Sequence, residues 1–126
     1  MRTQNSKRVN GIGFVKTRKA ISHIFLLLED MCRVAREANV DLVGVNVDEG
    51  WSKDIDRQEI SRLYQRLEEE NLSAVVFQNL HDVTDDEEDF CKFMKDMSEK
   101  SIVIVDMKAH KVFLPDEKEE GCDKHE

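Results

Sequence analysis

Short apolar runs alternate along this chain with longer segments whose apolar residues recur at helical spacing. The apolar runs predict strands that are buried on both faces. They cover residues 9–15, 42–47, 72–77, 101–105 and 112–114. The amphipathic segments predict helices at 21–38, from 56 and from 84. This alternation favours an α/β fold, a doubly wound three-layer sandwich with a mostly parallel sheet of four or five strands.

The composition is that of one globular domain. The chain has 126 residues, of which 40% are hydrophobic and 37% are charged. We expect residues 1–115 to form the domain and the acidic segment 116–126 to be disordered. The longest apolar run, residues 24–28, is too short to cross a membrane. We therefore expect a cytoplasmic protein without a membrane partner.

Polar residues mark several element ends. Asn39 and Asn71 follow the first two helical segments, and each is placed to end a helix in a left-handed turn. Thr84 precedes Glu87 by three positions, and this capping box predicts the start of the third helix. Trp51 lies in the loop after the second strand, where it either packs against the end of the sheet or contacts a partner, and we favour packing.

Charge is unevenly distributed along the chain. The net charge of −8 argues against a general nucleic-acid binder, because such affinity comes largely from neutralised phosphates. Six of the eight residues in 82–89 are acidic, and a helix start is the simplest explanation, because the macrodipole favours carboxylates there. The four histidines are scattered without metal-ligand spacing, so we expect no metal and no cofactor.

Three sequence motifs follow the strands in a fixed order. After the second strand, Asp48 is followed four positions later by Ser52. Residues 56–60 then read Asp-Arg-Gln-Glu-Ile, and the third strand leads into a segment with apolar residues at Leu80 and Val83. In their order and spacing, these motifs resemble those of the catalytic domain of serine recombinases, the resolvase and invertase family.

The resemblance covers residues 7–107 and implies the fold of that domain. In active members of the family, a serine attacks a DNA phosphate and several arginines stabilise the charge that develops on its oxygens. An ungapped count back from Asp48 places Thr17 at the position of the serine, and Arg57 matches one of the arginines. The resemblance thus implies that Thr17 and Arg57 are the remaining, vestigial catalytic residues.

Other catalytic positions of the family are replaced. Val15 stands at the position of one arginine, and Asp82 and Asp85 stand where two more belong. Two carboxylates that face a phosphate would repel it, and phosphoryl transfer depends on positioned cations. No cofactor follows from the resemblance.

Three functional hypotheses follow. The leading one is a catalytically inactive recombinase relative that acts as a binding or regulatory module, with a protein partner or a second copy, and with DNA binding weak or lost. The second is a divergent DNA recombinase with Thr17 as nucleophile and Arg57 as phosphate ligand. The third is a small protein that binds phosphate or another anion through Lys16, Arg18 and Lys19, because these residues follow the first strand.

Overall fold

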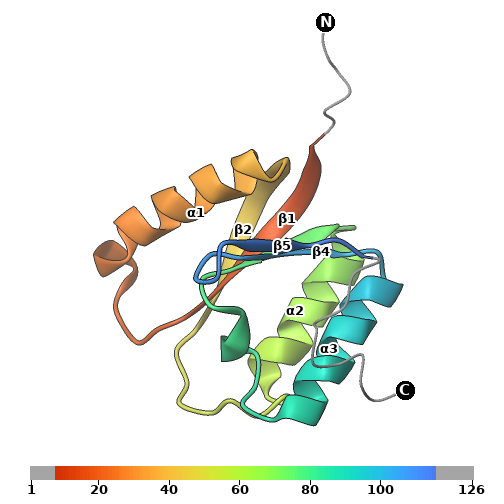
Figure 1. The fold of residues 1–126 in the computed structure, drawn as a ribbon. Coiled ribbons are helices and arrows are strands. Elements are labelled where there is room, and N and C mark those ends of the chain that lie inside the picture. Colours follow the sequence, from red (N-terminus) through yellow and green to blue (C-terminus); the bar gives the residue numbers. More distant parts are fainter. Residues whose placement is uncertain (1–7, 116–126) are drawn as a thin grey trace, which may run out of the picture.

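The computed structural model describes residues 8–115, which form a five-stranded sheet between helices (Figure 1). The sheet has the order β2-β1-β3-β4-β5. Its first four strands pair in parallel, and β5 pairs antiparallel with β4. The strands are β1 Val9–Lys16, β2 Val40–Asp48, β3 Ala74–Phe77, β4 Val103–Asp106 and β5 Lys111–Phe113. The predicted α/β class and mostly parallel sheet are confirmed.

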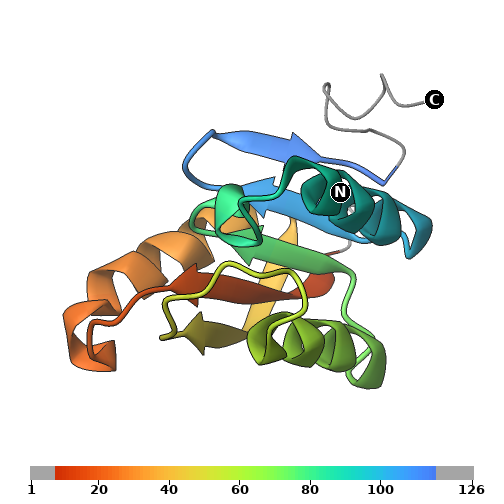
Figure 2. The same cartoon turned by 90° about the horizontal axis from the view of Figure 1, so that it is seen from below.

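The helices lie on both faces of the sheet, as a three-layer sandwich requires. Helix α1, Phe25–Glu37, covers one face, and α2, Gln58–Glu69, and α3, Glu87–Glu99, cover the other (Figures 1 and 2). The first predicted helix is interrupted, because Ile21–His23 forms a 3-10 turn before α1 begins. A second 3-10 turn, Leu80–Asp82, follows β3.

Each face of the sheet has its own apolar core. On the side of α2 and α3, Phe77 packs between Phe14 and Phe93, with ring centroids 5.5 and 6.0 Å apart. On the side of α1, Val15 and Val76 pack with Met31 of the helix. Neighbouring residues of a strand point to opposite faces, so β1 and β3 each contribute apolar side chains to both cores.

The helix ends match the sequence in part. Asn39 and Asn71 have φ angles of 64° and 54°, which confirms the predicted left-handed turns after α1 and α2. The predicted cap at Thr84 is wrong, because the carboxylate of Asp86 caps α3 by accepting the Asp89 amide at 2.9 Å. The Thr84 hydroxyl instead accepts the Asp86 amide at 3.1 Å, and so shapes the turn just before the helix.

The topology determines where a ligand site is expected. Strand β1 lies between β2 and β3. The connection after β1 leads to one side of it, and the connection after β2 leads back past β1 to the other side. In open sheets of this kind, ligands bind at the carboxyl ends of the strands beside such a switch point. Within residues 8–115, no helix is long and apolar enough to cross a membrane. The acidic segment 116–126, predicted to be disordered, lies outside the described residues.

Candidate functional site

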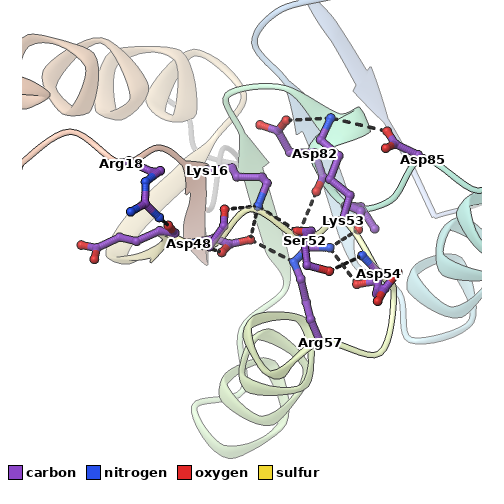
Figure 3. Close-up of polar contacts among 12 residues, drawn as sticks. Lys16, Arg18, Asp48, Ser52, Lys53, Asp54, Arg57, Asp82 and Asp85 are labelled. Atoms are coloured by element: carbon purple, nitrogen blue, oxygen red, sulfur yellow. Dashed lines mark hydrogen bonds and ion pairs between the residues drawn. The ribbon is translucent and has the colours of Figure 1, made fainter.

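Three loops at the carboxyl ends of β1, β2 and β3 are held together by a buried ionic network (Figure 3). Lys16 is the last residue of β1, Asp48 is the last residue of β2, and Arg57 directly precedes α2. The side chains of Lys16 and Arg57 converge on the Asp48 carboxylate from two directions (Figure 3).

Asp48 is the centre of this network and is fully buried. Its Oδ2 accepts from Arg57 Nε at 2.9 Å and from Lys16 Nζ at 3.2 Å, and its Oδ1 accepts the Gly50 amide at 3.0 Å. Burial alone would raise the pKa of Asp48, but the hydrogen bonds from Gly50, Arg57 and Lys16 together hold the pKa below its ordinary value. The carboxylate is therefore ionised at neutral pH and neutralised by its two cationic neighbours.

Arg57 joins the loop after β2 to the turn after β3. Its side chain is 7% exposed, and every nitrogen of its guanidinium donates a hydrogen bond. Besides Nε, Nη1 donates to the carbonyls of Asp54 at 2.8 Å and Val83 at 2.7 Å, and Nη2 donates to the carbonyl of Asp82 at 2.7 Å. Four of the five N–H groups of the guanidinium are therefore directed at protein oxygens.

Lys16 is held in a similar way. Its Nζ donates to Asp48 Oδ2, to the Gly50 carbonyl at 2.7 Å and to the Ser52 carbonyl at 2.8 Å. An ammonium group has three N–H bonds, so each of them has an acceptor within the chain. The lysine consequently fixes the loop that follows β2, and its charge is compensated by Asp48.

A second ionic cluster lies beside the first. Lys53, in the loop after β2, places its Nζ 3.6 Å from an oxygen of Asp82 and 3.6 Å from an oxygen of Asp85 (Figure 3). Burial raises the pKa of Asp82, although Lys53, Lys16 and Arg57 act in the opposite direction. Asp85 is largely exposed. Two carboxylates therefore share one lysine at the edge of the site.

Comparison with solved structures shows that the fold of this chain is a known one. The N-terminal catalytic domain of TP901-1 integrase matches with a TM-score of 0.63 at 16% identity, covering 80% of each chain. The C-terminal catalytic domain of ISC1926 TnpA, an IS607-like serine recombinase, gives 0.59 at 14% identity, covering 79% of this chain and 67% of that one. A resolvase family site-specific recombinase from Streptococcus pneumoniae gives 0.60 at 14% identity, covering 83% and 76%.

The fold is that of serine recombinase catalytic domains. This confirms the fold that the sequence motifs imply. By sequence, neither a family model nor a curated protein matches the chain. The serine recombinase fold is thus established here by the backbone, while the roles of individual residues depend on the geometry of this site.

Not all of the positions matched to serine recombinase catalytic residues lie together. The Thr17 amide donates to the Asp48 carbonyl at 2.9 Å, and the Thr17 hydroxyl accepts the Lys19 amide at 3.1 Å. Within residues 8–115, no side chain forms a hydrogen bond with that hydroxyl. Val15 is fully buried in the core under α1, away from the network around Arg57. The structure brings Arg57, Asp82 and Asp85 together, but not Val15.

The exposed cations lie at the rim of the site. Arg18 and Lys19 are both exposed, and the Arg18 guanidinium lies over the ring of Trp51, 4.5 Å from its centroid. The expectation that Trp51 packs against the sheet is wrong, because its exposed fraction is 81%. Of the three anion-binding candidates, Arg18 and Lys19 remain accessible, and Lys16 belongs to the buried network.

Sequence reasoning missed two members of the site. Asp48 was used only to align a motif. A charged residue that ends a buried parallel strand is itself an indication of a functional site. Lys53 was not singled out, although it is the cation that faces Asp82 and Asp85. In the described part of the chain, no group of three or more His, Cys, Asp or Glu side chains is arranged to hold a metal ion.

Proposed function

We propose that this chain is a serine recombinase-like domain without strand-cleaving activity, which acts as a binding or regulatory module. The observation that carries the proposal is the state of Arg57. Its guanidinium is buried and donates to the Asp48 carboxylate and three backbone carbonyls. To bind a phosphate, it would have to break these hydrogen bonds, and the partly buried carbonyls of Asp82 and Val83 would lose their donor.

The charge of the site supports the same proposal. Where the resemblance implies arginines, Asp82 and Asp85 place carboxylates, and Lys53 compensates them only in part. A phosphodiester that entered here would meet like charge, which costs several kcal/mol when the groups are partly desolvated. Losing one preorganised stabilising group commonly lowers a rate by about a hundredfold or more, and charge reversal exceeds such a loss.

The alternative of a divergent recombinase needs an activated Thr17. A threonine hydroxyl is a weak nucleophile unless a neighbouring base takes its proton. The hydroxyl here accepts a backbone amide, and within the described residues no side-chain base contacts it. The anion-binding alternative depends on Arg18 and Lys19, because the Lys16 ammonium is already satisfied inside the chain.

DNA binding is the property to test first. Fluorescence anisotropy with a mixed-sequence duplex, over a salt series, should show weak binding even at low salt. Arg18→Glu with Lys19→Glu removes the exposed cations without disturbing the buried network, and should abolish whatever binding remains. Tight, salt-sensitive binding by the wild type would contradict the expectation that DNA binding is weak or lost. A rise in melting temperature with millimolar phosphate that the double variant loses would favour the anion-binding alternative.

A further inference from the structure

The two faces of the sheet are covered unequally. Helices α2 and α3 cover one face, while α1 alone lies over the other (Figures 1 and 2). Beside α1, toward β4 and β5, a groove of about 340 Å³ remains open. Its apolar lining consists of Val34, Ala38, Val105, Met107 and Val112. Part of the apolar surface on this face is therefore left without a covering element of the described chain.

Helix α1 also carries an exposed apolar end. Leu26 is 77% exposed and Phe25 is 58% exposed, both in the first turn of the helix. Helical geometry places Leu26 on one stripe with Asp30, Arg33 and Glu37, which follow it at four, seven and eleven positions. The three charged residues of this stripe also line the groove. The outer face of α1 is thus a continuous surface from Leu26 to the groove.

The charges on this surface are ordered along the helix. Glu29 and Asp30 lie in its first half, and Arg33 and Arg36 lie in its second half, which ends with the acidic Glu37 and is therefore less strongly basic than the first half is acidic. Two such helices side by side in parallel would bring like charges together. In an antiparallel arrangement, the acidic half of each helix faces the basic half of the other, and Asp30 faces Arg33.

We propose that this face of α1, with the groove beside it, is an interface for a second copy of the chain, with the two α1 helices antiparallel. Two α1 helices that cross midway between Asp30 and Arg33 place Leu26 of one copy beside Glu37 and Ala38 of the other. That position is the end of the groove. Twofold symmetry repeats the contact, so each copy inserts Leu26 and receives Leu26.

A second copy fits this surface better than an unrelated protein. The α1 surface itself carries both the projecting leucine and the groove that would receive it, and both the acidic and the basic residues. The projecting Leu26 lies in the first turn of α1, and the groove runs beside the helix from Asp30 to Ala38, so its far end lies at the opposite end of the helix from Leu26. Within one copy, Arg33 already pairs with Asp30 and Glu37, and all three side chains remain about half exposed. They therefore keep surface available for a partner. The inference does not depend on the loss of recombinase activity.

Sedimentation velocity of the full chain over a concentration series tests the interface. We expect a wild-type dimer, and Leu26→Asp should weaken dimerisation roughly tenfold or more. Val43→Asp is the matched control, because Val43 is an exposed valine on β2 and should leave the dimer intact. A wild-type chain that stays monomeric at high concentration would overturn the inference, and so would a dimer unaffected by Leu26→Asp.

Charge exchange tests the antiparallel arrangement itself. Glu29→Arg with Asp30→Arg makes the outer face of α1 wholly basic near its centre, and Arg33→Glu with Arg36→Glu makes it wholly acidic. Each variant alone should be monomeric, while an equimolar mixture should form a heterodimer. Circular dichroism confirms that each variant is folded. If either variant alone dimerises as the wild type does, or if the mixture of folded variants stays monomeric, the arrangement is wrong.

Discussion

Arg57 and Asp48 form a buried ion pair, with Nε 2.9 Å from Oδ2 and both side chains almost inaccessible to solvent. The pair joins the end of β2 to the start of α2, and the remaining donors of Arg57 extend it to the turn after β3. Arg57, which the sequence motifs match to an arginine of serine recombinases, is thus part of the scaffold in this chain. Substituting Arg57 should therefore change the stability of the fold before any other property.

Arg57→Ala should lower the free energy of unfolding by about 3–5 kcal/mol, because it leaves a buried carboxylate with only one of its two cationic partners. Three backbone carbonyls also lose their donor. Urea denaturation followed by circular dichroism measures the loss. Arg62→Ala, at an exposed position of the same helix α2, is the control and should change stability little. A loss at Arg57 no larger than at Arg62 would show that the network is unimportant.

Stability should fall in acid partly through Asp48. The pKa of this group is lower in the folded chain than in the unfolded chain, so its contribution is present above the unfolded value. That contribution is lost as the pH falls through the folded pKa. Asp48→Asn should therefore weaken the protein at pH 7 and flatten the acid limb of a plot of stability against pH. An acid limb as steep as that of the wild type would contradict this prediction.

Asp82 should act with the opposite sign. Burial raises its pKa, so the folded chain binds this proton more tightly than the unfolded chain. Stability associated with the group is present at low pH and falls as the pH rises through the folded pKa. Asp82→Asn should consequently increase the melting temperature at pH 7 and have little effect below pH 4. Exposed Asp85→Asn is the control, since no comparable change is expected there.

Restoring cations at the site should restore affinity for DNA. Asp82→Arg with Asp85→Arg changes the net charge from −8 to −4 and places two guanidinium groups beside the loop after β2. If both contact phosphates, the slope of log K against log salt should steepen by about 1.8. The control is Glu68→Arg with Glu99→Arg. This variant has the same net charge, but its arginines lie at exposed positions near the ends of α2 and α3. Equal affinity of the two double variants would mean that position does not matter.

The fold was accessible from the sequence because its signals are local. The alternation of apolar runs and amphipathic segments specifies the layers, and Asn39 and Asn71 mark helix ends through their own backbone preference. The site was accessible only in part, because its decisive contacts join distant residues. Arg57 donates to the Val83 carbonyl 26 positions away, and Lys16 donates to the Ser52 carbonyl 36 positions away. The spacing of apolar residues does not indicate which backbone carbonyl will accept a hydrogen bond from a guanidinium or an ammonium group.

The measurement that tests the loss of catalysis most directly is trapping of a covalent protein–DNA adduct. Labelled duplex and supercoiled plasmid DNA are incubated with the wild type, Thr17→Ser and Thr17→Ala, then denatured and separated by size. We predict no adduct and no nicked plasmid with any of the three, because Arg57 is held by acceptors of the protein and no side-chain base contacts the Thr17 hydroxyl within the described residues. An adduct that forms with the wild type and disappears in Thr17→Ala would contradict the proposal and establish a divergent recombinase.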